Sequence, residues 1–406
     1  MSTDLRRIGE KARKDHRLVF TSLYHHVTDV DNLRACYEAL PGDRVAGVDG
    51  VTKEQYGEQL EENLQGLSQR LRRMGYKPQP KRRSYIPKPG SEKGRPLGIS
   101  CFEDKLVEWV IGKILENVYE PVFIRNSFGF RPNKSADGAI KAVYYSLKSN
   151  NRPHVVEIDF ASFFNTIPHD KLMKCLGKRI SDNRFKGLIG RFLKVGILEQ
   201  SGELKLSEIG TPQGSVMSPL LANIYLHYVL DSWFLENYSS YNNIIVRYAD
   251  DAVFFFKKKT DADSFVKDLF DRVGLYGLSL NMDKTRIIDF DKRKHNSFNF
   301  LGFTFYWAKK SSDKRYVLKL KTRKETLHKK IKDFTQWIKE NRNRYRTKEL
   351  FKKTRAKLMG HYQYYGYWMN TGKLNHYYQE VIKNLFKWLN RRSQKQSFTW
   401  EKFVRK

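Results

Sequence analysis

The first 75 residues place apolar and polar positions with the period of an α-helix. Leu33, Cys36, Tyr37 and Leu40 lie a helical turn or less apart, and the leucines between residues 60 and 71 repeat this spacing. Such spacing gathers the apolar side chains on one helical face. Between the two runs lies AGVDGVT, whose glycines predict a loop. We therefore expect a helical N-terminal region interrupted by a loop.

Further along the chain, the period of the apolar residues changes several times. Short β-branched or aromatic runs bounded by polar residues predict strands, whereas longer runs with a helical period predict helices. We predict strands over residues 155–160 and 298–305, and helices over residues 104–121, 217–234 and 261–277, with a further helix beginning after Pro168. Residues 77–99 are rich in proline, glycine and basic residues, and predict two extended segments joined by a cationic loop over residues 88–95.

The stretch IIVRYADDAVFFF, residues 244–256, predicts two strands with a tight turn at residues 249–251. Asp250 and Asp251 are adjacent within this otherwise apolar run. Two neighbouring carboxylates repel each other and lose hydration on burial, unless a cation neutralises them. One interpretation is a solvent-exposed hairpin turn, in which aspartate tolerates unusual backbone angles. The other is a cation-binding site.

A third acid favours the cation site. Asp159 ends the predicted strand VVEID, so it would lie near the aspartate pair if the strands are neighbours. Carboxylate oxygens of this kind suit magnesium. Two such ions about 4 Å apart would hold the attacking and leaving oxygens of an in-line phosphoryl transfer.

Between these acids lies GTPQGSVMSPLLANIYL, residues 210–226. Its GTPQG segment predicts a turn that brings backbone close to a ligand, and a helix beginning near Ser218 would form the floor of a pocket. A loop that only caps a helix would explain the glycines. It would not explain why Gln213 occurs together with the acids.

Composition narrows the class of partner. The 406 residues are 40% hydrophobic and 14% aromatic, enough for substantial cores, and carry a net charge of +32. This charge indicates a polyanionic partner, either nucleic acid or an anionic membrane surface. No apolar run reaches the length of about 18 residues that a membrane-spanning helix needs. Nucleic acid is therefore the favoured partner.

Cysteine spacing and the N-terminal segment predict the compartment. Cys36, Cys101 and Cys175 lie far apart, without the paired spacing of a disulfide framework or a zinc site. The N-terminal segment MSTDLRRIGEKARKDHR lacks the apolar core of a signal peptide. Both features predict a protein of the reducing cytoplasm.

Basic residues are concentrated towards the C-terminus. Residues 309–357 hold twenty lysines and arginines against five acids, and this shift in composition places a boundary near residue 306. Charge runs usually face solvent, but so large an imbalance over helix-like segments indicates a polyanion. The candidate nucleic-acid contacts in this region are Lys309, Lys310, Arg323, Lys324, Lys352 and Lys353. Four tyrosines within YQYYGY, residues 362–367, could stack on bases, although packing in a helical core is the favoured interpretation.

Several motifs follow one another along the chain. They are RRSYIPKPGSEKGRPLGI, SFGFRPNKSADGAI, the Asp159 motif with Phe163 and Phe164, GTPQGSVMSPLLANIYL, YADD, GLSLNMDKT and FNFLGFTF, with FTSLYHHV before them and GHYQYYG after them. In this order they resemble the reverse transcriptases encoded by bacterial group II introns. One departure is Ser100, where that family usually has proline, and we expect it to be tolerated.

The resemblance implies an α+β fold of the right-hand polymerase type. Its antiparallel-sheet palm would carry the three aspartates, fingers would precede and interrupt the palm, and an α-helical thumb would follow. The corresponding ranges are residues 1–154 for the N-terminal extension and fingers, 155–305 for the palm with some fingers segments, and 306–406 for a basic thumb and maturase-like region. The implied host compartment is the bacterial cytoplasm.

The resemblance also implies roles for single residues. Asp159 and Asp250 would hold two Mg²⁺ ions, and Asp251 would complete or support the site. Phe163 or Phe164 would exclude a ribose 2′-hydroxyl, a choice that the sequence leaves open. The nucleotide contacts would come from Lys88, Arg95, Gln213 and Lys284.

Several other residues have more than one interpretation that the sequence leaves open. Lys284 could also act as a general acid to pyrophosphate, or be a solvated surface lysine. Arg131 would contact the template phosphate or support the fingers. Tyr248 could belong to the site or pack as a strand residue in the core. His361 is expected to be structural rather than catalytic.

The implied activity is RNA-directed DNA synthesis from deoxynucleotides on an RNA template with a DNA or RNA primer. Three biological roles are compatible with the sequence. The first is an intron-encoded enzyme that also helps a structured intron RNA to splice and move. The second is a domesticated relative that acts with a non-coding RNA or another partner in antiviral defence, spacer acquisition or DNA repair. The third is an RNA-binding splicing factor without polymerase activity, and the three intact aspartates argue against it.

Overall fold

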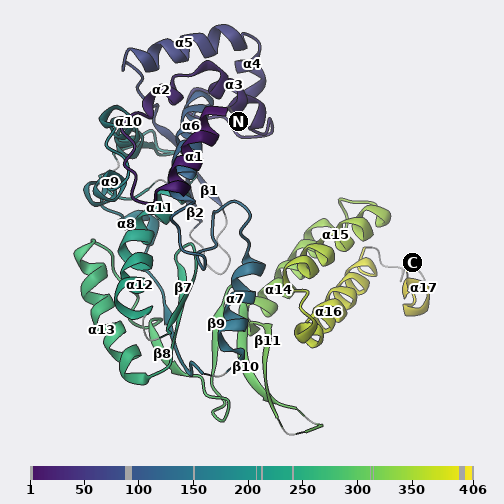
Figure 1. Cartoon of the computed structure of the whole chain (residues 1–406). Coiled ribbons are helices and arrows are strands. Elements are labelled where there is room, and N and C mark those ends of the chain that lie inside the picture. Colours follow the sequence, from purple (N-terminus) through teal and green to yellow (C-terminus); the bar gives the residue numbers. More distant parts are fainter. Residues whose placement is uncertain are drawn as a thin grey trace. The chain divides into compact units, whose positions relative to one another are not determined.

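Two compact units make up the computed structural model shown in Figure 1. The first comprises Met1–Ala139, Val156–Phe254 and Lys259–Arg286, and the second comprises Ile140–Val155, Phe255–Lys258 and Ile287–Lys406. The structure describes residues 3–86, 94–149, 151–206, 208–211, 214–239, 242–310, 312–313, 315–392 and 398–404. Within these ranges, no helix is both long enough and apolar enough to cross a membrane.

Helix α6 (Phe102–Tyr119) is central to the helical part of the first unit. Val107, Val110 and Ile111 on this helix are fully buried, because helices from the N-terminal region pack against it. A helix that is apolar around most of its circumference is stable in water only when other elements pack against it on several sides. The predicted helical N-terminal region is confirmed, and its helices are α1 (Thr3–Lys14), α2 (Tyr24–Val27), α3 (Val30–Ala39), α4 (Lys53–Gly57) and α5 (Leu60–Arg72).

The two predicted extended segments are strands β1 (Lys81–Ile86) and β2 (Arg95–Ile99). They pair antiparallel, with Ser84 opposite Leu97. β1 also pairs in parallel with β4 (Ile197–Leu198), and β5 (Leu204–Lys205) completes the order β2-β1-β4-β5.

A second sheet, with the order β6-β7-β3-β8, contains the strands around the acids. Phe254 of β7 packs on Phe234 and Phe265, with ring centroids 5.1 and 4.5 Å away, and all three rings are fully buried. This aromatic layer fixes the strand that follows the aspartate pair. The strands are β3 (His154–Ile158), β6 (Ile244–Tyr248), β7 (Asp251–Phe256) and β8 (Arg286–Asp289). The first three confirm the predicted strands.

The helix predicted over residues 217–234 contains an irregular turn. α11 (Ser218–Leu226) leads into the π-helical turn η1 (His227–Asp231), and α12 (Ser232–Tyr238) follows. A π turn is wider than an α turn and redirects the side chains that follow it. The prediction of one regular helix is therefore wrong at this turn. The other helices of the first unit include α8 (Phe163–Thr166), α9 (His169–Gly177), α10 (Asn183–Lys194) and α13 (Lys259–Leu275), while α7 (Ala136–Lys148) extends into the second unit.

The single strand predicted over residues 298–305 is wrong, because this segment is a hairpin. β9 (Ser297–Phe300) and β10 (Phe303–Lys309) pair antiparallel, with Phe300 opposite Phe303. Leu301 and Gly302 form the two-residue loop with φ values of 48° and 79°. Two positive φ angles give a turn whose twist matches the strands it joins. β11 (Tyr316–Thr322) completes the order β11-β10-β9, and the composition shift near residue 306 falls within β10.

Three long helices follow, which we call the helical bundle: α14 (Lys324–Asn341), α15 (Thr347–Tyr365) and α16 (Thr371–Leu389). Their shared core includes Phe334, Ile338, Leu350, Val381 and Leu385, each at most 3% exposed. The short helix α17 (Trp400–Val404) adds Phe403 to this core. The apolar stripe of each helix faces the others, so most of the basic residues lie on the outer faces.

Candidate active site

Asp250 and Asp251 lie on a tight turn, which we call the Asp250 turn (residues 248–251). Tyr248 is the last residue of β6, and Asp251 is the first residue of β7. Ala249 has a φ of 55°, a left-handed conformation that is costly for a residue with a side chain. Such a residue persists only where its surroundings hold it, so the neighbours of the turn define its geometry.

Asp159 follows directly after β3, the strand beside β7 in the sheet. Its carbonyl oxygen accepts a hydrogen bond from the Asn281 amide at 2.7 Å, and the Ala161 amide donates to the Ser279 carbonyl at 2.9 Å. These bonds align the Asp159 segment with the chain that leads to Lys284. Lys284 Nζ lies 3.1 Å from Asp159 Oδ2.

The three carboxylates influence one another. Burial raises the pKa of the Asp251 carboxyl to about 6, with further contributions from the charges of Asp250 and Asp159, while Lys284 opposes the shift. Part of Asp251 remains exposed to solvent, so repulsion between the carboxylates matters here as well as lost hydration. The structure thus places the three predicted acids close enough for their charges to interact, and we call them the acidic cluster.

The donor chemistry of this cluster fits magnesium. Carboxylate oxygens are the ligands that Mg²⁺ prefers, and a divalent cation would relieve the repulsion that raises the pKa of Asp251. Within the described ranges, no group of three or more His, Cys, Asp or Glu side chains has the geometry of a formed metal site. Lys284 instead neutralises Asp159. Metal binding would therefore require the carboxylates to converge.

A fully buried arginine, Arg247, holds the Asp250 turn. Its Nη1 donates to the Ala249 carbonyl oxygen at 2.8 Å and to Asn223 Oδ1 at 2.9 Å. Its Nε donates to Asp231 Oδ1 at 2.8 Å, and Nη2 forms an ion pair with Asp231 Oδ2 at 2.5 Å. The guanidinium thereby fixes the carbonyl that directly precedes Asp250, while Asp231 compensates its charge.

Residues of the SFGFRP motif pack against the same turn. Asn223 Nδ2 donates to the Gly129 carbonyl at 2.7 Å, and the Phe128 amide donates to the Arg247 carbonyl at 2.9 Å. A Cβ atom on Gly129 would lie 2.4 Å from the Ala249 nitrogen. Any side chain at this position would displace the turn, so glycine is required here.

The described part of the GTPQG loop is fixed by its backbone. The Gly210 amide donates to the Ile167 carbonyl at 2.8 Å, and the Thr211 amide donates to the Phe164 carbonyl at 2.7 Å. Gly214 has a φ of 105°, and a Cβ there would lie 2.7 Å from the Gly98 carbonyl oxygen. The loop thus joins the segment after β3 to strand β2.

A second buried ion pair anchors the end of this loop. Lys81 Nζ lies 2.6 Å from Glu108 Oε1, and both side chains are at most 2% exposed. Glu108 Oε2 accepts a hydrogen bond from the Val216 amide at 2.9 Å, and Oε1 accepts one from Ser100 Oγ at 3.2 Å. Ser100, the departure noted in the sequence, thus adds a hydrogen bond that proline could not supply.

The two candidate sugar-discriminating residues differ in burial. Phe163 is 3% exposed and packs between Phe160 and Phe164, with ring centroids 5.3 and 5.4 Å away. Phe164 is only partly buried, and its carbonyl oxygen holds Thr211 of the GTPQG loop. Phe163 is therefore a core residue, whereas Phe164 has a face beside the loop.

The remaining predicted nucleotide contacts lie outside the description. Lys88 and Gln213 are not among the described residues, and only the backbone of Arg95 is described.

Arg131 is 8% exposed and forms an ion pair with Glu120 at 2.8 Å. It also donates to the carbonyl oxygens of Ile124 and Ser127. The sequence left two roles open for Arg131, namely contact with the template phosphate and support of the fingers. These contacts are of the kind that a supporting residue makes.

The predicted nucleic-acid contacts of the second unit are all exposed. Lys310 lies 3.7 Å from Asp313, and Arg323 lies 2.9 Å from Glu325. Lys353 lies over the Tyr345 ring at 4.6 Å. The full set remains Lys309, Lys310, Arg323, Lys324, Lys352 and Lys353. Their exposure leaves the ammonium and guanidinium groups accessible to phosphate.

Sequence reasoning missed the buried charges that hold the loops, namely Arg247, Asp231 and Glu108. A signal was present, because Arg247 is the one charge in the strand IIVRY and Asp231 lies in an apolar helical segment. Arginine and aspartate are almost never fully buried unless they are paired. The signal predicts a buried pair, but it does not assign the partners.

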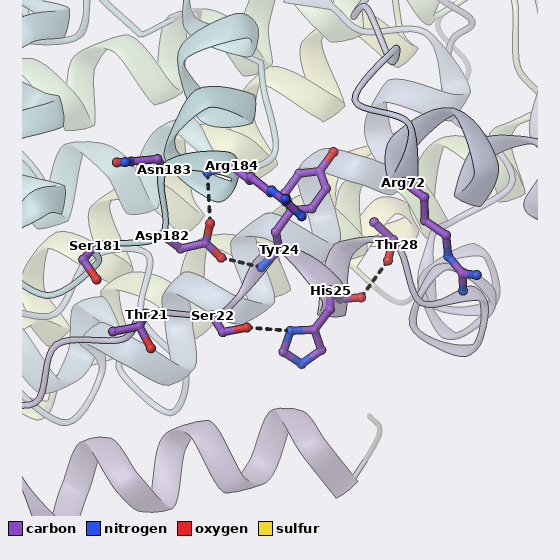
Figure 2. Close-up of a pocket in the computed structure, with 10 residues that line it drawn as sticks. All are labelled: Thr21, Ser22, Tyr24, His25, Thr28, Arg72, Ser181, Asp182, Asn183 and Arg184. Atoms are coloured by element: carbon purple, nitrogen blue, oxygen red, sulfur yellow. Dashed lines mark hydrogen bonds between the residues drawn. The ribbon is translucent and has the colours of Figure 1, made fainter.

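A separate hollow of about 510 Å³ lies at the start of α10 and contains none of the three acids. Figure 2 shows Asp182 pointing to the amides of Tyr24 and Arg184. Burial opposes ionisation of Asp182, but hydrogen bonds from backbone amides outweigh it and lower the pKa. Asp182 caps α10 and ties residues 23–24 to it, so this carboxylate of the hollow serves the fold.

Comparison with known families identifies the class of protein. A family model described as "Reverse transcriptase (RNA-dependent DNA polymerase)" matches residues 86–305, more than half of the chain. The chain therefore belongs to the reverse transcriptase family.

Individual relatives narrow the class. The chain is 38% identical over 232 residues to the group II intron-encoded protein LtrA of Lactococcus lactis subsp. cremoris, an alignment that covers 57% of this chain and 38% of LtrA. It is 35% identical over 295 residues to protein YkfC of Escherichia coli (strain K12), covering 64% of this chain and 76% of YkfC. The chain is thus a group II intron-like reverse transcriptase, as the motifs predict, and its alignment spans less than half of LtrA.

Proposed function

We propose that this chain is an RNA-directed DNA polymerase, which extends a DNA or RNA primer on an RNA template. The primer 3′-hydroxyl would attack the α-phosphate of a deoxynucleotide and release pyrophosphate. The observation that carries the proposal is the acidic cluster, in which Asp159 and Asp250 help to raise the pKa of Asp251. Membership of the reverse transcriptase family supports the same reaction.

Asp159, Asp250 and Asp251 would hold two Mg²⁺ ions, which would supply charge neutralisation for the phosphoryl transfer. Lys284 now compensates Asp159. With Asp159 serving as a metal ligand, the Lys284 ammonium would be free to contact the triphosphate or to protonate the leaving pyrophosphate. Arg247 would position the cluster through the Ala249 carbonyl, because phosphoryl transfer depends mainly on placement and charge.

The nucleotide would lie between the acidic cluster and the GTPQG loop. Phe164, which is partly exposed and bonded through its carbonyl to this loop, is the better candidate to exclude a 2′-hydroxyl. Gln213 would contact the incoming nucleotide or the templating pair. Lys88 and Arg95 would neutralise the triphosphate.

The proposed polymerase regions follow from this assignment. Residues 155–305 would act as the palm, the preceding residues as N-terminal extension and fingers, and the basic helical bundle as thumb. The exposed lysines and arginines of the second unit would contact the RNA backbone. A structured RNA would be the cognate partner. Relatives named as intron-encoded or intron proteins favour an intron RNA over a partner in defence or repair.

Primer extension tests the proposal. The reaction would contain a generic RNA template, an annealed DNA primer, the four deoxynucleotides and magnesium. We expect full-length cDNA from the wild type and none from the Asp250→Asn protein, since the substitution removes a metal-binding carboxylate. Asp263→Asn, which neutralises an exposed acid on α13, is the matched control and should extend normally.

Two results would contradict the proposal. One is equal extension by the wild type and Asp250→Asn proteins. The other is no extension by a wild type that binds the template tightly, even after its neighbouring transcript is added. The second result would favour the splicing-factor role.

A further inference from the structure

The helical bundle contains a pocket of about 600 Å³ that has no role in the proposed reaction. Residues from α14, α15 and α16 line it, among them Lys330, Lys357, Gly360, His361 and Tyr364. All of these residues belong to the second unit. The volume is sufficient for a small organic ligand.

Aromatic rings form one wall of this pocket. His361 stacks on Tyr365 and Tyr377, with ring centroids 4.7 and 3.9 Å away and interplanar angles of 30° and 26°. It is 6% exposed, and neither of its ring nitrogens has a hydrogen-bond partner among the described residues. The neighbouring Tyr364 is 40% exposed. Tyr364 contacts Tyr365 edge to face, with ring centroids 4.7 Å apart. Tyr364 is therefore the accessible ring of this wall, and the stacked, buried rings of His361, Tyr365 and Tyr377 support it; an accessible aromatic ring is the kind of surface on which a base stacks.

Two cations lie at the same pocket. Lys330 and Lys357 both line it, with Asp333 as the acid in the lining. Burial lowers the pKa of Lys357, and repulsion from Lys330 and Lys353 lowers it further. The acid Asp333 opposes this shift of the pKa without cancelling it. Two ammonium groups that repel each other favour an anion between them.

Gly360 lines the same pocket without a side chain, and we call this part of the lining the pocket floor. It lies inside α15, where glycine weakens a helix relative to alanine. A Cβ at this position would meet no heavy atom within 4 Å, so packing does not require glycine. The absent side chain leaves the helix backbone accessible to a flat ligand.

We propose that this pocket binds one unstacked nucleotide of an RNA strand. The base would lie on the aromatic wall over Gly360, and Lys330 and Lys357 would contact its phosphate. Bases within a duplex are stacked and cannot offer a face to the wall, so the ligand is a bulged, looped or terminal nucleotide. The proposal deepens the proposed RNA binding of this chain and does not depend on polymerase activity.

Fluorescence of 2-aminopurine tests the pocket. The full-length protein would be titrated into an RNA duplex that carries 2-aminopurine as a single bulge, and into the same duplex with the base paired. We expect the bulged RNA to bind about tenfold more tightly at equal salt, because stacking on aromatic side chains favours an accessible base. Gly360→Leu should remove this preference, since the new side chain would occupy the floor.

Three controls separate the pocket from folding and from catalysis. Gly187→Leu places leucine at an exposed glycine inside α10 and should keep the preference. Gly360→Ala should raise the melting temperature, which shows that the helix accepts a side chain. The Asp250→Asn protein should also keep the preference, so that failure of the pocket and failure of the polymerase are distinguished.

Competition identifies the source of the nucleotide. Displacement of the bulged RNA by micromolar adenosine monophosphate would assign the pocket to a free nucleotide and overturn the RNA assignment. Displacement of the bulged RNA by polyglutamate to the same extent would show that the pocket recognises negative charge alone. This result would also overturn the RNA assignment. Equal affinity of the wild type for bulged and paired RNA would overturn the proposal outright.

Discussion

The Asp250 turn and the helical bundle differ in where they keep their charges. At the turn, Arg247 and Asp231 are fully buried and bonded to each other, and Arg247 also donates to a backbone carbonyl. In the bundle the core is apolar, and basic side chains such as Lys352 and Lys353 face solvent. The first arrangement fixes a backbone carbonyl, whereas the second leaves cations accessible to a partner.

Energetics explain why the two regions use charge differently. A buried ion pair gains little stability over an apolar pair of the same size, because both ions lose their hydration. The buried ion pair at the Asp250 turn therefore serves to position the backbone. Ala249 has a left-handed φ, and its neighbours must maintain this conformation. An exposed cation retains its hydration, so it costs the folded protein little free energy, and it can neutralise a phosphate when nucleic acid binds.

The largest effect should come from the acids themselves. Asp159→Asn or Asp250→Asn should lower the primer-extension rate by about a thousandfold or more, because each removes charge that would hold magnesium. Asp250→Asn should also raise the melting temperature of the metal-free protein, since the repulsion on Asp251 falls. Asp159→Asn should change the melting temperature less, because it also removes the ion pair with Lys284. Single-turnover extension and calorimetry would measure both. Loss of activity together with a lower melting temperature would show damage to the fold instead.

Arg247 should give the next largest effect. Arg247→Met leaves Asp231 buried without a partner and should destabilise the protein by about 3–5 kcal/mol. The double variant Arg247→Met/Asp231→Leu should recover most of this stability, because no buried charge remains. It should still extend primers about a hundredfold more slowly, with the deoxynucleotide KM little changed, since the Ala249 carbonyl lacks its donor.

A matched control tests whether this result is specific to the Asp250 turn. Lys81→Met/Glu108→Leu removes the other buried ion pair and frees the Val216 amide at the GTPQG loop. Because this loop is proposed to contact the nucleotide, the control should raise KM more than it lowers kcat. Identical kinetic changes in the two double variants would show that Arg247 does not position the acids.

Magnesium should stabilise the protein in a pH-dependent way. Because the pKa of folded Asp251 is raised from its ordinary value of 3.8 to about 6, the folded state holds this proton more tightly than the unfolded state. Stability of the metal-free protein should therefore fall as pH rises from about 4 to 6. Magnesium binds the ionised carboxylates, so its effect on the melting temperature should be larger at pH 8 than at pH 5.5. Asp251→Asn should remove most of this pH dependence.

The comparison also shows what the sequence could predict. The strands around the aspartates follow from their apolar runs, and the acidic cluster follows from acids at the ends of neighbouring strands. The contacts of Arg247 do not follow, because Asp231 lies at the end of a π turn that a regular helical period cannot locate. The hairpin at residues 301–302 was missed because Leu301 adopts a positive φ, which is unusual for leucine. Phe163 and Phe164 are equivalent in sequence, and only the structure distinguishes them, by burial and by the contact of Phe164 with the GTPQG loop.

The smallest effect should come from the exposed cations of the bundle. Lys352→Gln/Lys353→Gln should weaken binding of duplex RNA by a similar factor for all sequences, because these side chains would contact phosphate. Each lost phosphate contact should reduce the slope of log affinity against log salt by about 1. Lys267→Gln, an exposed lysine on α13, is the control and should leave the slope unchanged. A salt slope unaffected by the double substitution would mean that these lysines face solvent in the complex, and that the basic surface for RNA lies elsewhere on the chain.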